Sequence, residues 1–247
     1  MHLHPAQPRG GICLSKILPS WVRKARSLGT AATLLGESGG VCPQRSEQTL
    51  RVREELVTRY GIRIANIGSY PGAAFASESV EEREAAMREM KDTIDLAVRF
   101  GSRSIRVLPG EGEDPEIIER IVEPFPESAR YAKEKGIYLG MENHMGSMAR
   151  NPDWCLKLCE AVGSKHCGLL YEPCNWMHAG EDYRKALDTF GGWVTHVHGK
   201  DGRWEAGEFR RCHLGEGAVD LRWVFDNTEA LGYVGDNALV ELAEFAK

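Results

Sequence analysis

Four residues with metal-binding side chains lie near the ends of four apolar runs in the second half of this chain. They are Glu142, Glu172, His198 and Glu241. The runs cover residues 137–144, 167–175, 193–198 and 238–242, and helix-like segments separate them. Alternating strands and helices predict a parallel sheet, and the ends of its successive strands meet at one edge. The four side chains are therefore expected together at that edge.

Carboxylates in such strands need a compensating partner. A parallel sheet is covered on both faces, so its strands are nearly all apolar, and an unpaired buried charge is costly. Three carboxylates and one imidazole share the same position on successive strands, which points to one common partner. Oxygen and nitrogen donors of this kind suit a divalent cation. The pattern predicts a single metal ion, with manganese, magnesium or cobalt favoured and zinc as a further possibility.

Composition places the chain among ordinary globular proteins. Its 247 residues are 42% hydrophobic and 27% charged, and the net charge is −5. An acidic balance argues against nucleic acid as the main partner. No apolar run is long enough for a membrane helix, and the start lacks the apolar core of a signal peptide. Seven scattered cysteines form no disulfide or zinc framework, so we expect a cytoplasmic protein. From the charge and the absence of long apolar runs we expect neither a nucleic-acid nor a membrane partner.

The remaining elements predict an α/β fold, a (β/α)8 TIM barrel in a single domain over residues 1–247. Its first 45 residues are poorly defined: a short strand at 11–14, a helix at 21–28 and a strand at 30–35 are weak patterns. Further strands are expected at 62–69 and 103–109. Helices are expected at 46–60, from 79 to about 100, in two pieces over 115–135, at 151–162, at 181–190 and at 219–231. Residues 201–218 read as a long polar loop.

The two ends of the predicted barrel are unusual. The N-terminal part is irregular, and only about five residues follow the last predicted strand, so the eighth helix is missing or truncated. The seam between the last and first strands would then expose Val240 and Leu242. Exposed apolar surface usually marks an interface. We therefore expect the N-terminal segment or a neighbouring chain to cover the seam, which makes a homo-oligomer possible.

Five short motifs resemble the xylose-isomerase-like TIM-barrel superfamily, often described as sugar phosphate isomerases/epimerases. They are Met141-Glu-Asn-His144, Tyr171-Glu-Pro-Cys-Asn175, His196-Val-His-Gly-Lys-Asp201, Leu214-Gly-Glu-Gly217 and Val240-Glu241. The resemblance covers about residues 46–247. Each motif is weak alone, but their order and spacing are specific for the superfamily, though not for a substrate.

The resemblance implies roles for these residues. In the ketohexose 3-epimerases of the superfamily the metal is held by Glu, Asp, His and Glu, and the matching positions are Glu142, Glu172, His198 and Glu241. Glu142 and Glu241 would also form the catalytic pair. The chain departs from the epimerase pattern at three of its positions: Glu172 replaces an Asp, Asn175 a substrate-binding His, and Trp204 an Arg. The substrate-binding candidates are His144, Asn175, Lys200, Asp201 and His213. His196 is expected to support the site as a hydrogen-bonded histidine of the core.

The chemistry implied is proton transfer beside a carbonyl. One carboxylate removes a proton from the carbon next to a polarised carbonyl, and a second returns it through an enediolate. The main hypothesis is a metal-dependent isomerase or epimerase of a sugar or polyol ketone. The alternatives are a metal-dependent lyase or dehydratase on a keto-sugar or cyclic hydroxy-ketone, and a non-catalytic sugar-binding relative. DNA-repair endonucleases of the superfamily need several more His ligands on earlier strands, and residues 62–110 contain no His.

Overall fold

A computed structural model of the chain describes residues 32–35, 46–61, 63–110, 117–144, 146–235 and 237–239. The strand expected at 11–14, the helix expected at 21–28 and the shortened eighth helix lie outside these residues. Glu241, Val240 and Leu242 also lie outside them, so the expected fourth ligand and the covered seam stay predictions. Within the described residues, no helix has the length and apolar character needed to cross a membrane.

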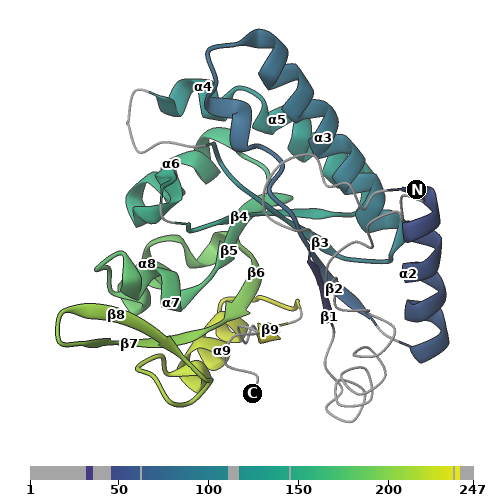
Figure 1. The fold of residues 1–247 in the computed structure, drawn as a ribbon. Helices are drawn as coiled ribbons and strands as arrows, with labels where there is room; N and C mark the ends of the chain where they lie inside the picture. Colours follow the sequence, from purple (N-terminus) through teal and green to yellow (C-terminus); the bar gives the residue numbers. More distant parts are fainter. Residues whose placement is uncertain are drawn as a thin grey trace, which may run out of the picture.

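A curved parallel sheet forms the centre of the molecule (Figure 1). Its strands follow the order β1-β2-β3-β4-β5-β6-β9, and every neighbouring pair is parallel. Their bounds are β1 Ala32–Leu35, β2 Ile64–Gly68, β3 Ser104–Val107, β4 Tyr138–Glu142, β5 Cys167–Tyr171, β6 Val194–Gly199 and β9 Asn237–Leu239. All residues of β2, β3 and β5 are buried, as expected for a sheet that is covered on both faces. The strands predicted from apolar runs are confirmed.

Helices surround the sheet on its outer side (Figure 1). They are α2 Glu47–Tyr60, α3 Val80–Arg99, α4 Ile118–Val122, α5 Phe125–Lys135, α6 Pro152–Val162, α7 Pro173–His178, α8 Tyr183–Phe190 and α9 Leu221–Ala230. Local sequence explains several boundaries. The Ser79 side chain accepts a hydrogen bond from the Glu82 backbone N–H at the start of α3, and Asn151 caps α6 in the same manner. The predicted division of 115–135 into two pieces is confirmed, with Pro124 at the junction.

The long polar loop predicted for residues 201–218 is wrong for its first part. Residues Asp201–Glu205 and Glu208–Cys212 form an antiparallel hairpin, β7–β8. Ala206 and Gly207 both have positive φ angles, 50° and 86°, which suits the two-residue turn of a right-twisted hairpin. The hairpin escaped prediction because one of its faces is in water, so its residues lack the apolar content of the barrel strands.

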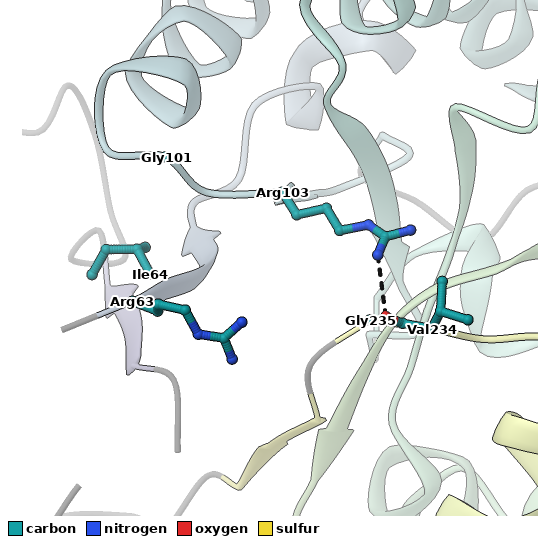
Figure 2. Close-up of a pocket in the computed structure, with 6 residues that line it drawn as sticks. All are labelled: Arg63, Ile64, Gly101, Arg103, Val234 and Gly235. Atoms are coloured by element: carbon teal, nitrogen blue, oxygen red, sulfur yellow. Dashed lines mark hydrogen bonds between the residues drawn. The ribbon is translucent and has the colours of Figure 1, made fainter. Parts of the chain in front are cut away.

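A cavity of about 180 Å³ lies at the N-terminal ends of the strands, between the start of β3 and the segment before β9 (Figure 2). Arg103 crosses this gap and donates a hydrogen bond to the Val234 carbonyl at 3.1 Å. Its guanidinium also lies 5.0 Å from the centre of the Tyr138 ring. Arg103 thus joins an early strand to the last described one, away from the strand ends that carry the predicted ligands.

Candidate metal centre

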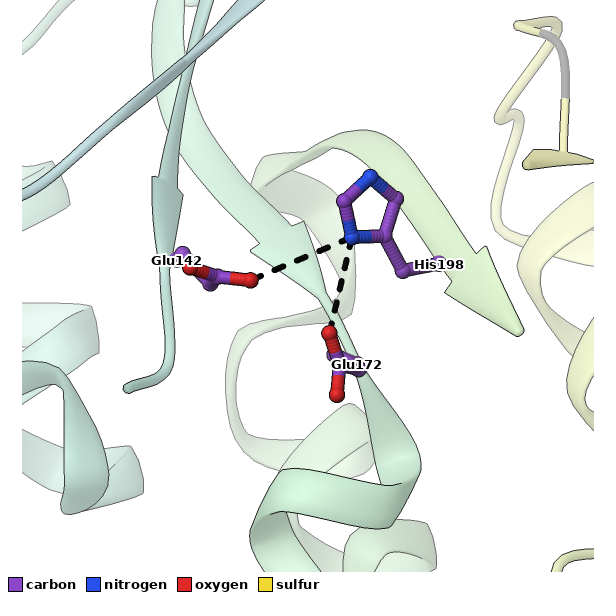
Figure 3. Close-up of side chains that lie close together, drawn as sticks. All are labelled: Glu142, Glu172 and His198. Atoms are coloured by element: carbon purple, nitrogen blue, oxygen red, sulfur yellow. Dashed lines mark ion pairs between the residues drawn. The ribbon is translucent and has the colours of Figure 1, made fainter. Parts of the chain in front are cut away.

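Three of the four predicted ligands converge at the C-terminal ends of adjacent strands. Glu142 ends β4, Glu172 follows β5 directly, and His198 lies on β6. Figure 3 shows the two carboxylates and the imidazole pointing toward one another. Nδ1 of His198 lies 3.5 Å from Oε2 of Glu172 and 3.9 Å from Oε1 of Glu142. One donor atom from each residue lies within 4.8 Å of the other two. In barrels of this kind, active sites occupy this end of the strands.

Most donor atoms of this triad are buried without a hydrogen-bond partner among the residues that the structure describes. All three side chains are at most 3% exposed. Both oxygens of Glu142, one oxygen of Glu172 and both ring nitrogens of His198 have no hydrogen-bond partner. Buried polar atoms are normally paired, so such a cluster needs a partner from outside the chain. Donors around an ion with bonds of about 2.1 Å lie about 3 Å apart, close to the separations observed. The triad therefore fits a divalent cation.

Lys200 neutralises one of the two carboxylates. Its Nζ donates to Oε2 of Glu172 at 2.6 Å. Burial alone would raise the pKa of Glu172, but the charges of Lys200 and His198 and their hydrogen bonds outweigh burial and lower that pKa. Glu172 is therefore ionised and a weak base. Its backbone is fixed by Asn143, whose side-chain amide donates to the Glu172 carbonyl at 2.9 Å and accepts from its N–H at 3.0 Å.

Arg106 is a member of the site that the sequence did not reveal. This arginine on β3 is only 7% exposed, and its Nη1 lies 3.5 Å from Oε1 of Glu142. Its Nε donates to the Ser69 carbonyl, and its guanidinium lies 4.0 Å above the Tyr70 ring. Burial and the nearby Glu142 carboxylate raise the pKa of Tyr70 to about 12, so its hydroxyl keeps its proton. Arg106 and His198 thus both lie near Oε1 of Glu142.

His196 takes the supporting position expected for it. It is buried one layer below His198, and the two ring centres lie 5.3 Å apart. Burial, with a smaller contribution from His198, keeps the pKa of His196 well below its ordinary value. The ring is therefore neutral, and its Nδ1 lies 3.4 Å from the Tyr233 hydroxyl.

The five predicted substrate-binding residues fall into different surroundings. Lys200 and Asn175 lie at the triad: Asn175 is buried three residues after Glu172, and its backbone N–H donates to the Glu172 carbonyl at 3.2 Å. His144 is exposed just beyond β4, with its ring 6.1 Å from that of Tyr70. His213 follows β8 and is partly exposed. The substrate-binding roles of all five residues stay predictions.

Asp201, the fifth candidate, is the hub of a loop. Its Oδ1 accepts from the backbone N–H groups of Gly202 at 2.8 Å and Val219 at 3.1 Å. Its Oδ2 accepts from Gly215 at 2.9 Å and Gly217 at 3.0 Å. A side chain at Gly217 would lie 2.0 Å from Oδ1, so only glycine fits there. Both oxygens are occupied by the protein, and Asp201 fixes the Leu214-Gly-Glu-Gly217 segment beside the hairpin.

Comparison with known proteins identifies the family. The sequence profile described as Xylose isomerase-like TIM barrel matches residues 22–244. The chain belongs to this family. The predicted family resemblance and the predicted TIM-barrel fold are thereby confirmed. The curved sheet is the part of the barrel that the structure describes.

Two curated relatives of this chain are named inosose dehydratase. The protein from Geobacillus thermodenitrificans is 29% identical over 119 residues, which cover 42% of this chain and 40% of the relative. The protein from Clostridium perfringens is 25% identical over 233 residues, which cover 82% of this chain and 77% of the relative. The chain thus spans less than two thirds of the first relative. The names of these relatives support the prediction that the chain is an enzyme of the xylose isomerase-like family.

Solved structures share the fold at low sequence identity. A xylose isomerase-like TIM barrel protein from Mycobacterium smegmatis in complex with magnesium is 18% identical with a TM-score of 0.74, over 94% of this chain and 85% of that one. L-ribulose 3-epimerase is 19% identical with a TM-score of 0.71, over 93% and 77%. The IOLI protein with a bound zinc atom is 18% identical with a TM-score of 0.65, over 79% and 73%. Such neighbours therefore bind either magnesium or zinc.

Proposed function

We propose that this chain is a metal-dependent isomerase or epimerase that moves a proton beside the carbonyl of a polyhydroxylated ketone. The observation that carries the proposal is the cluster of Glu142, Glu172 and His198, in which all but one of the buried donor atoms lack a hydrogen-bond partner among the described residues. These residues would hold one divalent cation, and Glu241 would be a fourth ligand from the part of the chain that is not described. When bound, the ion would polarise a substrate carbonyl as a Lewis acid and so acidify the neighbouring C–H.

The surroundings of the two described carboxylates assign them different roles. Glu172 accepts a hydrogen bond from Lys200, and its pKa is lowered, so it is poorly suited to take a proton. Glu142 has no hydrogen-bond donor on either oxygen, and Arg106 at 3.5 Å holds its orientation. Glu142 is therefore the better proton acceptor for a C–H placed beside it. The proton would return from Glu241 on the other side of the substrate, as the family resemblance implies.

A dehydratase is the second candidate, because both curated relatives compared above carry that name. Dehydration begins with the same proton removal and ends with loss of a hydroxyl from the next carbon. The tyrosine hydroxyl of Tyr70 keeps its proton and lies near Glu142, so it is a candidate acid for such a departure. The shared first step makes one experiment informative for both reactions.

The test is exchange of the substrate C–H with solvent. The metal-free full chain is loaded with manganese, magnesium, cobalt or zinc and incubated in D2O with D-tagatose, L-ribulose or inosose. Proton NMR should show loss of the C–H signal beside the carbonyl. An epimer as product supports the first candidate, and an unsaturated product that has lost water supports the second.

Variants connect the exchange to the site. Glu142→Gln keeps the shape but removes the base, and should reduce exchange by about a hundredfold or more. Glu160→Gln, an exposed glutamate on α6, is the matched control and should exchange at the rate of the unaltered chain. Near-full exchange by Glu142→Gln on a substrate that the unaltered chain turns over would contradict the role of Glu142.

A further inference from the structure

The β7–β8 hairpin brings a second arginine to the metal centre. Arg211 on β8 pairs with Gly202 on β7, and its Nη2 donates to the Asn175 Oδ1 at 3.3 Å. Neighbouring residues of a strand point to opposite faces, so Arg210 faces away. Arg210 is 62% exposed and lies near Glu205 and Glu208 on the surface. One strand thus carries a site-facing arginine and a solvent-facing one side by side.

Asn175 has a donor without a partner. The residue is 3% exposed, and its Nδ2 has no hydrogen-bond partner, while its Oδ1 is used by Arg211. A buried donor left unpaired destabilises the protein that carries it. Asn175 lies on the first turn of α7, and its backbone N–H donates to the carbonyl of the triad residue Glu172, three positions earlier. An acceptor atom of a bound molecule would satisfy the unpaired Nδ2.

Arg211 has no counter-ion among the described residues. Within the described part of the chain, no carboxylate oxygen is recorded within 4.0 Å of its guanidinium, although the side chain is partly buried. The other two cations at the site are matched: Lys200 pairs with Glu172, and Arg106 lies beside Glu142. The edge of the site near α7 and β8 therefore offers hydrogen-bond donors and one unmatched positive charge.

From this juxtaposition we infer that Arg211 and Asn175 bind an anionic oxygen group on the substrate, a carboxylate or a phosphate. A guanidinium matches the two oxygens of such a group, and charge-assisted hydrogen bonds are the strong ones. The inference rests on the proposed function, and it narrows the substrate to polyhydroxylated ketones that carry an acidic group.

The test compares three ketoses that differ at one end. D-fructose, D-fructuronate and D-fructose 6-phosphate carry a hydroxyl, a carboxylate and a phosphate at the same carbon. Their affinities for the manganese-loaded full chain are measured by isothermal titration calorimetry. At least one charged ketose should bind about tenfold or more tightly than D-fructose, and the better one identifies the acidic group. If neither charged ketose binds more tightly than D-fructose, the inference is overturned.

Three variants locate the effect. Arg211→Ala should abolish the preference for the charged ketose, whereas Arg210→Ala on the same strand should retain it. Asn175→Asp keeps the shape of the side chain but gives Arg211 an internal counter-ion, so it should also abolish the preference. Manganese affinity and melting temperature of each variant show whether the fold and the triad are intact. A preference that survives both Arg211→Ala and Asn175→Asp would overturn the inference.

The binding assay separates this inference from the proposed function. If the unaltered chain exchanges the C–H of a ketone but shows no charge preference, the anion site is wrong and the proposed function stands. If it shows the preference through Arg211 but Glu142→Gln leaves exchange unchanged, the anion site stands and the proposed mechanism is wrong.

Discussion

Replacement of Asp201 by Asn should destabilise the fold by several kcal/mol while preserving the shape of the side chain. The carboxylate accepts four backbone N–H groups, two on each oxygen. In the amide, one oxygen becomes an NH2 group, which faces two N–H donors and accepts from neither. Each hydrogen bond to a charged group contributes about 1.5–3 kcal/mol, so the loss of two predicts about 3–6 kcal/mol.

Equilibrium unfolding in guanidinium chloride measures this loss. The midpoint should move to lower denaturant with little change in the slope, and circular dichroism and tryptophan fluorescence should agree. Glu205→Gln is the control on the same hairpin, because its ion pair with Arg203 is exposed and contributes little to stability. A destabilisation below about 1 kcal/mol for Asp201→Asn would refute the view that Asp201 is the hub of the loop.

Three further predictions concern pH, packing and thiols. The pKa of His196 in the folded protein is well below its unfolded value of about 6.5, so the unfolded chain binds a proton that the folded chain does not, and acid favours unfolding. Between pH 7 and 5 the free energy of unfolding of the unaltered protein should therefore fall by about 2 kcal/mol more than that of His196→Asn. Gly168→Ala should lower the free energy of unfolding, measured with denaturant, by at least about 2 kcal/mol, because its Cβ would lie 2.0 Å from a carbonyl oxygen. Gly192→Ala, where the added Cβ has space, should change it by less than about 0.5 kcal/mol. Equal effects of the two substitutions would contradict this packing. Burial raises the pKa of Cys167 well above its ordinary value, so mass-spectrometric mapping of alkylation should find the partly exposed Cys212 labelled before Cys167, and the reverse order would be wrong for this fold.

The barrel strands and three ligands could be predicted because they contradict their surroundings. An acidic residue such as Glu142 at the end of an apolar run is conspicuous, and it repeats on the next strand as Glu172. Arg106 gave no such signal: a single arginine in Ser104–Val107 looks like an ordinary edge charge until β3 and β4 pair and place it beside Glu142. Long-range pairing of this kind is not encoded in local periodicity.

Two local features were also missed for physical reasons. The short helix α7 was not predicted, although proline suits the first turn of a helix and α7 begins at Pro173. The hairpin carries charged and aromatic residues on a solvent-facing surface, so it resembled a loop, and Arg211 was not connected with Asn175. The family resemblance predicted that Asn175 binds substrate, whereas only the folded structure revealed its hydrogen bond with Arg211.

The positions of the three ligands on consecutive strands have a consequence for how the sheet assembles. Glu142 on β4 is paired with Leu170 on β5, and Leu170 is paired with His196 on β6. Glu172 therefore lies two residues after the partner of Glu142, and His198 lies two residues after the partner of Leu170. A slip of one residue in either pairing would turn a ligand to the opposite face, and a slip of two would move it by about 6.6 Å. Only the native alignment of β4, β5 and β6 can therefore present all three donors to one ion. During folding, such an ion would stabilise correctly aligned strands over every shifted pairing of the same apolar segments.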